Sequence, residues 1–539
     1  MPRGREASAA GRYAGEIFCN RSLNMAKIAA IGFDMDYTLC QYIPEEFEAL
    51  AYSGAIRRLV STLGYPAAII SDFPAYDHSR FTRGLVIDKR RGNVLKLDRH
   101  KYVKLAYHGF EEVPQKERQR TYNGEGGTGV RWSEFVEPDF AVVDTIFSVP
   151  DALLFSLLVE FKDKNPPLLQ HKTYFDLYTD VRASIDTVHN DGTIKTEVAA
   201  NPEKYILVDK QLVPALERLR RSGRKLFLLT NSYWGHTDNV MRFLYGKHYG
   251  PDRAARWTDL FDVVIVGSCK PAFLLDKRRA LYRVIPNAAA AADAPPPVDG
   301  ILTNTKGVED VPSRNPREYL AQGKIFQEGN WTHLHGMLDI VVGSQVLYVG
   351  DHMYSDILRS KRELGWRTML VIPELEHEVN VMLHESPHLS QLNELRILRD
   401  ELDEWVDRLH SQADAAITDN DSDSDSESPR ALALATELRT ARADSAAVKT
   451  RLALATKAYH HAYHPIWGQL FKTGYQHSRF AAQVEDYACL YAARVTNLAR
   501  VSPEMHFRCM DDALPHDRIE ESPIRRIFRR RMGGNEGIV

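Results

Sequence analysis

Four short apolar runs, each followed at once by polar side chains, form the clearest pattern in this chain. They cover residues 29–33, 225–229, 263–266 and 346–350. Apolar runs of this length, bounded by polar groups, are typical of buried strands in a parallel sheet. Polar residues follow the carboxyl end of every run, which is the edge where open α/β sheets bind their ligands. The pattern therefore predicts an α/β fold with a functional site at that edge.

The residues that follow the four strands have the chemistry of phosphoryl transfer. Asp34 and Asp36 lie two positions apart, so alternation along an extended chain puts both carboxyl groups on one side. The later strands are followed by Thr230, Asn231 and Ser232, by Lys270, and by Asp351 and Asp356. A carboxylate nucleophile, a carboxylate for proton transfer, phosphate-binding hydroxyls and a compensating lysine make a complete site. Residues 31–39 alone also fit a strand ending in an acidic turn, but the ordered occurrence of all four groups favours an enzyme.

The spacing of the strands predicts an inserted domain. The stretch between the first and second strands is far too long for a loop and must carry its own structure. Inside it, residues 85–97 predict a β-hairpin around a glycine turn, and residues 152–161 predict a helix with an apolar face. We therefore expect a catalytic core at 24–50 and 205–385, with an α+β cap domain at 51–204.

The rest of the chain predicts helices and low-complexity segments. Charged helical patterns at 389–409 and 431–459 flank an acidic serine tract and indicate an antiparallel helical hairpin. The expected segments are a disordered extension at 1–23, a flexible insert at 286–297, helices over 386–500 with a disordered linker at 414–430, and a basic tail at 501–539. The arginines of the tail fit a solvated segment better than a contact with the phosphates of nucleic acid or lipid.

Composition excludes several classes of function. At 539 residues, 44% hydrophobic and 26% charged, the chain has the composition of a globular protein with more than one core. A net charge of −3 gives no global field that would attract nucleic acid or a membrane surface. No apolar stretch is long enough to span a bilayer. The five scattered cysteines favour reduced thiols, so we expect a cytoplasmic protein.

The sequence Asp-Met-Asp-Tyr-Thr-Leu at 34–39 resembles the haloacid dehalogenase superfamily of aspartyl phosphatases and, within it, the cytosolic purine 5'-nucleotidases. Residues 82–88, 350–352 and 365–374 are similar to the same family, and the resemblance covers 26–376 and 468–498. It implies a Rossmann-like core that hydrolyses inosine and guanosine monophosphates. It also implies phosphoryl transfer to other nucleosides, a homotetramer and activation by an adenine nucleotide.

The resemblance assigns a role to each catalytic residue. Asp34 is the nucleophile, Asp36 transfers protons, Lys270 offsets charge, and Thr230 with the backbone of Asn231 binds phosphoryl oxygens. The expected cofactor is Mg²⁺, which prefers hard oxygen ligands. The metal site comprises the carboxylates of Asp34 and Asp351, the backbone carbonyl of Asp36, and Asp356, which holds a metal-bound water or orients a ligand. For Asp356 the alternative is a helix N-cap, because a helical pattern follows it over 357–364.

A helical pattern at 180–189 carries the expected substrate-binding residues. Arg182, Asp186 and His189 form a polar stripe, which alone fits a surface helix with an i,i+4 ion pair. In the resembled family this stripe and a following lysine, here Lys195, read the base and the ribose phosphate. Phe147 stacks on the base, and Ser232 completes the substrate-binding set. Ser148 stands where the purine enzymes carry asparagine, which leaves the base preference open.

Two alternatives accompany this hypothesis. One is a related phosphatase that acts on a different small phosphate ester. The other is a catalytically quiet interaction protein that has retained the fold, although the presence of Asp34, Asp36, Lys270 and Asp351 argues against it.

Overall fold

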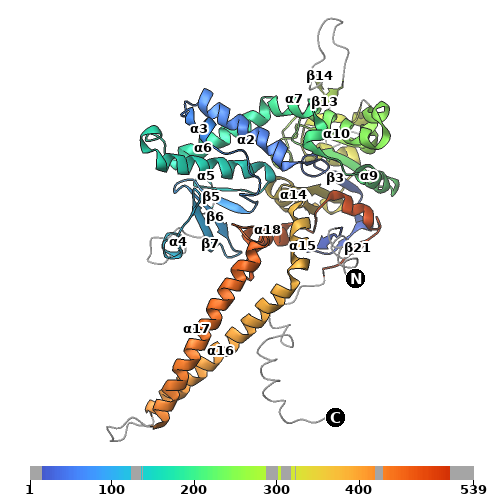
Figure 1. The fold of residues 1–539 in the computed structure, drawn as a ribbon. Helices are drawn as coiled ribbons and strands as arrows, with labels where there is room; N and C mark the ends of the chain where they lie inside the picture. The colour runs from blue at the N-terminus through green and yellow to red at the C-terminus, as the bar shows by residue number, and fades with distance from the viewer. Residues whose placement is uncertain are drawn as a thin grey trace, which may run out of the picture. The chain divides into compact units, whose positions relative to one another are not determined.

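The computed structural model describes residues 15–122, 135, 137–286, 301–304, 317–321, 323–418 and 429–509. These residues form two compact units. The first contains the described residues up to His377 together with Leu470–Cys509, and the second spans Glu378–Gln469. The first unit carries the mixed α/β architecture, and the second is helical (Figure 1).

A ten-stranded sheet organises the first unit, in the order β1-β20-β17-β16-β3-β11-β12-β15-β13-β14. Its strands are β1 (Phe18–Cys19), β20 (Leu490–Ala492), β17 (Arg367–Val371), β16 (Val346–Gly350), β3 (Ala30–Phe33), β11 (Lys225–Leu229), β12 (Val263–Val266), β15 (Ile325–Glu328), β13 (Leu281–Ile285) and β14 (Ile301–Asn304). The run from β20 to β15 is parallel, whereas β1, β13 and β14 add antiparallel edges. The strands predicted from the apolar runs are β3, β11, β12 and β16, and they are adjacent.

The unbroken apolar character of the central strands follows from burial on both faces. Alternate residues belong to two separate cores, so that Ile31 and Phe33 of β3 pack on one face while Ala30 packs on the other. Gly32 completes the second face, where a Cβ atom would lie 2.1 Å from the Phe227 ring. Phe33 is in register with Leu228 and Val349, so neighbouring strands end together.

Two segments differ from the sequence expectation of disorder. Phe18–Cys19 pairs with β20 at the edge of the large sheet, and β2 (Leu23–Asn24) pairs with β21 (His506–Phe507). The disordered extension is therefore wrong for residues 15–23, and the basic tail begins after β21. The reason is that short strands obtain their order from partners hundreds of residues away, which local composition does not reveal.

The region expected to be helical up to residue 500 also contains strands. After the second unit the chain returns to the first, forming β18 (Lys472–Thr473), β19 (Gln476–His477), α18 (Arg479–Tyr487), β20 and the 3₁₀ helix η8 (Val495–Arg500). β20 pairs in parallel with β17. The expectation failed because β20 is short and its backbone is satisfied by a distant strand.

The segment between β4 (Gln41–Tyr42) and β10 (Ile206–Leu207) combines a five-stranded antiparallel sheet with helices. The strands are β5 (Leu85–Asp88), β6 (Asn93–Leu97), β7 (Val103–His108), β8 (Glu111–Glu112) and β9 (Phe140–Val142), and the helices are α2 (Pro44–Ser61), α3 (Ala68–Asp72), α4 (Gln115–Tyr122), α5 (Val149–Lys164), α6 (Tyr174–Asn190), α7 (Thr193–Ala200) and α8 (Pro202–Tyr205). The predicted hairpin is confirmed as β5–β6, and Gly92 supplies its left-handed residue at φ 73°. The helix predicted at 152–161 lies within α5.

Helices that flank the large sheet complete the first unit. They are α9 (Leu212–Arg221), α10 (Trp234–Tyr249), α11 (Ala272–Leu275), α12 (Arg317–Leu320), α13 (Trp331–Leu338) and α14 (Arg359–Leu364), with a π-helical turn, η7 (Met353–Leu358), directly before α14. α15 (Glu374–His384) leads from the first unit into the second.

The second unit contains the predicted helical hairpin. α16 (Ser386–Thr418) and α17 (Pro429–His461) lie side by side (Figure 1). Leu392 and Leu395 of α16 form a buried cluster with Leu452 and Tyr459 of α17, and Tyr463, just after α17, belongs to the same cluster. The disordered linker expected at 414–430 is wrong at its two ends, because α16 continues to Thr418 and α17 begins at Pro429. The acidic tract at 419–428, the insert from residue 287 to 297 and the arginine cluster at 525–531 lie outside the described residues. Across the part of the chain that is described, no helix has both the length and the hydropathy that crossing a membrane requires.

Candidate active site

A cavity of about 530 Å³ opens at the carboxyl ends of the parallel strands. The sequence-predicted residues that line it are Asp34, Asp36, Phe147, Arg182, Asp186, His189, Lys195, Thr230, Asn231, Ser232, Lys270 and Asp351. Asp356 lies behind Lys270 and is fully buried. The structure therefore brings together all the side chains that the sequence analysis selected, from strands and helices far apart in the chain.

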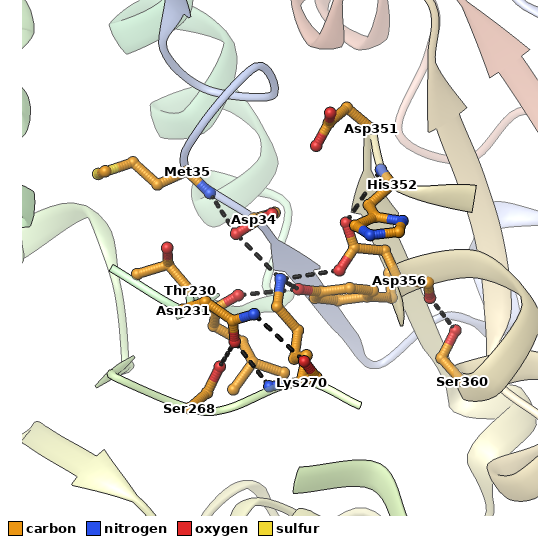
Figure 2. A network of polar contacts seen from close by, with 12 residues as sticks. Asp34, Met35, Thr230, Asn231, Ser268, Lys270, Asp351, His352, Asp356 and Ser360 are labelled. Atoms are coloured by element: carbon orange, nitrogen blue, oxygen red, sulfur yellow. Dashed lines mark hydrogen bonds and ion pairs between the residues drawn. The ribbon is translucent and has the colours of Figure 1, made fainter. Parts of the chain in front are cut away.

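Lys270 joins the carboxylates of the site. Its Nζ lies 3.0 Å from Asp34 Oδ1 and 2.8 Å from Asp356 Oδ1 (Figure 2). The same ammonium group donates to the Tyr348 hydroxyl at 2.9 Å, and that hydroxyl donates to the carbonyl of Leu229 at 2.8 Å. Lys270 is 7% exposed, so its interactions with the carboxylates are screened little by solvent.

Negative charge exceeds positive charge among these buried groups. Carboxylate oxygens of Asp34, Asp351 and Asp356 lie within 4.8 Å of one another, and all three residues are buried. Burial raises the pKa of Asp34, and the neighbouring Asp356 and Asp36 raise it further, although Lys270 opposes them. Burial, followed by the charges of Asp356 and Asp34, also raises the pKa of Asp351 well above its usual range. A cluster of hard oxygen atoms with uncompensated negative charge is the donor set that a divalent cation such as Mg²⁺ requires.

The backbone around Asp356 leaves room only for glycine at position 350. A Cβ atom on Gly350 would lie 2.4 Å from Asp356 Oδ2. That oxygen accepts a hydrogen bond from the backbone N–H of His352 at 3.2 Å. Asp356 sits inside the π-helical turn η7, whose N-cap is His352. The alternative of Asp356 as a helix N-cap is therefore wrong, because the helical turn begins before Asp356 and the Asp356 carboxylate contacts Lys270 instead.

Asp36 is held by donors on both carboxylate oxygens. Tyr42 donates to Oδ1 at 2.6 Å, and Ser232 donates to Oδ2 at 2.7 Å. The ring of His236 lies 3.7 Å from Oδ1. Burial acts to raise the pKa of Asp36, but the contacts with His236, Tyr42 and Ser232 outweigh it and lower the pKa.

The side chain of Asn231 holds the backbone around Lys270 in place. Its Oδ1 accepts hydrogen bonds from the backbone N–H of Lys270 at 2.6 Å and from the Ser268 hydroxyl at 2.9 Å. Its Nδ2 donates to the carbonyl of Lys270 at 3.2 Å. The hydroxyl of Thr230 accepts from the backbone N–H of Ser232 at 3.1 Å. These contacts connect the ends of β11 and β12 and so fix where the Lys270 side chain begins.

Arg83, which the sequence analysis did not select, supports the acidic cluster. It is 1% exposed and makes two hydrogen bonds to Glu374, at 2.7 and 2.6 Å. Its Nη1 donates to the backbone carbonyl of Asp351 at 3.2 Å. The carboxyl group of Asp351 itself accepts a long hydrogen bond from Thr145, at 3.4 Å. Arg83 lies in the 82–88 motif that carried the family resemblance, so a signal for it was present in the sequence.

At the other end of the cavity, Arg182 is held by two carboxylates. Its Nη1 donates to Asp151 at 2.8 Å, and its Nη2 and Nε donate to Asp186 at 2.6 and 3.1 Å. Asp151 is 1% exposed, and burial raises its pKa to about 6 even though Arg182 lowers it. The i,i+4 pair expected from the sequence is present, and Asp151 of α5 adds a contact that no local pattern indicated.

Aromatic groups form the wall beside this pair. Phe147 packs edge-on against Tyr37 and His189, with ring centroids 4.9 and 5.5 Å apart. His189 Nε2 is buried and has no hydrogen-bond partner among the residues that the structure describes. Burial, followed by the charge of Arg182, lowers the pKa of His189 to about 4, so its ring is neutral at physiological pH. Lys195 lies 5.4 Å from the centre of the Tyr233 ring.

Comparison with known proteins places this site in a family. Residues 17–519 match the 5' nucleotidase family. The chain is also 29% identical over 519 residues to 5'-nucleotidase domain-containing protein 2 of Rattus norvegicus, an alignment that covers 93% of this chain and 80% of the rat protein. The family match includes every residue of the cavity and confirms the resemblance to 5'-nucleotidases carried by the motifs. The chain belongs to the 5'-nucleotidase family and is a 5'-nucleotidase hydrolase.

Proposed function

We propose that this protein hydrolyses purine nucleoside 5'-monophosphates, with inosine and guanosine monophosphate preferred, through a phosphorylated Asp34 and with Mg²⁺ as cofactor. The observation that carries the proposal is Lys270 bridging Asp34 and Asp356, with Asp36 on the same cavity wall. In this proposal residues 24–50 and 205–385 form a haloacid dehalogenase core, whose sheet is extended by β1 and β20, and residues 51–204 are its cap.

The first half-reaction forms the covalent intermediate. A carboxylate oxygen of Asp34 attacks phosphorus, the bond from phosphorus to the nucleoside O5' breaks, and its electron pair stays on O5'. Asp36 gives its proton to O5', so the nucleoside leaves as a neutral alcohol. Such proton transfer typically contributes ~10²–10⁴-fold to the rate. The pKa of Asp36 is lowered in the free protein, and a phosphate dianion bound beside it would favour the protonated form.

The second half-reaction restores the protein. Asp36, now a carboxylate, takes a proton from a water molecule as the water oxygen attacks phosphorus. The acyl-phosphate bond breaks, the electron pair returns to Asp34, and inorganic phosphate leaves. Lys270 stays ionised throughout, because Asp34 and Asp356 raise its pKa well above the usual range despite its burial. When a nucleoside hydroxyl replaces the water, the same step gives phosphotransfer.

The acidic cluster fits the proposed cofactor. Its excess negative charge and short oxygen–oxygen separations match a hard divalent cation. Asp34 and Asp351 would hold Mg²⁺ with the carbonyl of Asp36, and Asp356 would support it directly or through water. When bound, Mg²⁺ reduces the repulsion between the phosphate and the carboxylates.

Another part of the cavity lining supports recognition of a nucleoside. Phe147 offers an aromatic face, His189 offers a ring nitrogen that has no partner among the described residues, and the Arg182–Asp186 pair offers donors and acceptors. Lys195 and Ser232 complete the polar contacts to the substrate. Ser148 is shorter than the asparagine of the purine enzymes, so the choice between inosine and guanosine monophosphate is left to experiment. The family resemblance supports a cytoplasmic homo-oligomer with an adenine-nucleotide effector.

Asp34→Asn tests the covalent mechanism. We expect phosphate release from inosine monophosphate to fall at least ~10³-fold, because the attacking oxygen is lost, while the circular dichroism spectrum stays the same. Asp252→Asn changes an exposed aspartate and should leave activity unchanged. Near-normal turnover by Asp34→Asn would reject the mechanism. A wild-type protein active only on a non-nucleotide ester would reject the nucleotide assignment and retain the phosphatase.

A further inference from the structure

His236 is buried beside Asp36 and has no role in the reaction steps above. We propose that His236 is a positioning residue: acting through Tyr42, it holds Oδ1 of Asp36 so that Oδ2 faces the leaving nucleoside. The inference rests on the proposed function, because it concerns the proton that Asp36 gives to O5'.

The three side chains come from separate segments. His236 lies in the first turn of α10, directly after β11, and is 7% exposed. Its Nε2 lies 3.0 Å from the Tyr42 hydroxyl. That hydroxyl is 2.6 Å from Asp36 Oδ1. Tyr42 is 2% exposed and is packed on the Phe47 ring with centroids 4.0 Å apart, so its hydroxyl has little freedom to move.

The direction of the hydrogen bonds follows from counting hydrogens. A tyrosine hydroxyl has one hydrogen, and an ionised carboxylate only accepts. Tyr42 therefore donates to Asp36, and its oxygen must accept from His236. The imidazole consequently carries a hydrogen on Nε2 and donates toward Tyr42. Donation into the hydroxyl oxygen strengthens the hydrogen bond that the hydroxyl makes to Asp36.

The two oxygens of Asp36 thereby acquire different tasks. His236 and Ser232 line the cavity, whereas Tyr42 does not. Tyr42 thus holds Oδ1 from outside the cavity lining, and Oδ2, whose partner is Ser232, faces the bound substrate. When Oδ2 carries the proton, the Ser232 hydroxyl can accept instead of donate, because a hydroxyl serves in both roles. The proton then passes from Oδ2 to O5' as the phosphorus–oxygen bond breaks, leaving the Asp36 carboxylate and a neutral nucleoside.

This arrangement predicts a dependence on the leaving group. A nucleoside O5' leaves as a poor, strongly basic alkoxide and needs the proton from Asp36. The leaving group of p-nitrophenyl phosphate is a stabilised anion and departs without one. A misplaced Asp36 carboxyl group should therefore slow release of the nucleoside far more than release of p-nitrophenol, whereas general damage to the site should slow both.

The test compares His236→Phe and His236→Gln on inosine monophosphate and p-nitrophenyl phosphate. We expect His236→Phe to lower kcat/KM for the nucleotide ~10–100-fold and kcat/KM for the aryl ester less than ~3-fold. The comparison uses kcat/KM because this constant covers the steps up to release of the leaving group, whereas hydrolysis of the aspartyl phosphate, which also needs Asp36, is common to both substrates. His236→Gln keeps a side-chain N–H donor near the position of Nε2 and should restore most of the lost kcat/KM. His335→Phe is the control, since His335 is also buried but lies outside the cavity and contacts Trp366.

Distinct results would overturn this inference. Equal losses on the two substrates, or no recovery with His236→Gln, would mean that His236 only supports the fold. A wild-type protein that hydrolyses neither ester would reject the proposed function itself, which separates the two failures. A variant that does not fold is recognised from its circular dichroism spectrum, and His236→Gln, the smaller change, then carries the comparison.

Discussion

The buried ionisable residues of this protein divide into those that face an opposite charge and those that do not. Lys270 faces Asp34 and Asp356, and Arg83 faces Glu374. Glu48 of α2 has 0% exposure, and its Oε1 accepts a hydrogen bond from the neutral hydroxyl of Tyr37 at 2.5 Å. A buried carboxyl group without a cation avoids the cost of desolvation by staying protonated.

Glu48→Gln should make the free energy of unfolding less dependent on pH. Burial raises the pKa of Glu48 from 4.5 to about 8, although the Tyr37 hydrogen bond lowers it. Between these values the unfolded chain ionises the group and the folded chain does not, so the free energy of unfolding falls as pH rises. Between pH 5 and pH 8, the free energy of unfolding of the wild type should fall by roughly 2–5 kcal/mol relative to that of Glu48→Gln. Urea midpoints at both pH values check this. Glu45→Gln, an exposed change in the same helix, should show no such difference.

Asp186→Ala should weaken base selection without harming the chemistry. Asp186 holds Arg182 through two hydrogen bonds. Among the described residues, its hydrogen bonds do not involve Asp34, Asp351 or Asp356. An unpaired polar group under the wrong base costs ~1–3 kcal/mol, so the ratio of kcat/KM between inosine and adenosine monophosphate should narrow roughly tenfold. Hydrolysis of p-nitrophenyl phosphate should change less than ~3-fold. Asp180→Ala, a change on the same helix but outside the cavity, removes the contacts of Asp180 with Lys172 and Tyr65 and should leave the ratio unchanged. A uniform loss on all substrates would remove Asp186 from base recognition.

At the level of elements, the site depends on strand ends and on the first turns of the segments that follow. β3, β11, β12 and β16 end in register, so Asp34, Thr230 and Asp351 reach one edge of the sheet. The antiparallel sheet contributes through the segment before β5, where Arg83 connects to the start of α15 at Glu374. Arg83 thus connects the segment before β5 to the start of α15 and, through the Asp351 carbonyl, to the end of β16.

Arg83→Met should raise the Mg²⁺ concentration needed for activity. The substitution removes the donor to the Asp351 carbonyl and leaves Glu374 without its partner. Losing a residue that orients a metal ligand typically costs ~10–100-fold in metal affinity, and we expect a shift of about tenfold. Mg²⁺ or Mn²⁺ binding measured by calorimetry gives the value independently of turnover. Glu374→Gln retains the bond from Arg83 to Asp351 and should shift the affinity much less. Equal shifts in the two variants would show that only the ion pair matters.

At the scale of the whole molecule, the main core of the first unit is built from residues that are far apart in the sequence. Ile31 of β3, Phe47 of α2 and Val188 of α6 belong to one cluster of buried residues. The inserted segment therefore does not bury its helices in isolation. A core of this kind predicts that β3 and α6 open together, because opening either exposes the same apolar surface.

Val188→Ala tests this shared stability. Val188 packs against Gly54, where a Cβ atom would lie 2.7 Å from its side chain, so a smaller residue leaves a gap. The deletion should destabilise the first unit by roughly 1–3 kcal/mol. Hydrogen exchange should show amides of β3 and of α6 losing protection by the same amount. Val448→Ala, a change in the second unit, should leave both segments unaffected. Faster exchange confined to residues 51–204 would show an independently opening domain.

The sequence by itself determined which strands carry the chemistry and at which edge it lies. Apolar runs and the polar residues after them are local properties, and so are the 3.6-residue stripe of α6 and the glycine turn of the β5–β6 hairpin. Asp34, Asp36 and Lys270 could therefore be identified as candidate site residues from the sequence alone. The family resemblance added Phe147 and Lys195, which no local pattern singles out.

Only the tertiary structure decided how these groups are held. His236 reaches Tyr42 across 194 residues, and Arg83 reaches Glu374 across 291. Hydrogen bonds between such distant side chains leave no periodic signal in the chain, so their partners emerge only when the sheet assembles. The same holds for β1 and β21, which are too short to be stable alone and obtain their backbone hydrogen bonds from distant strands.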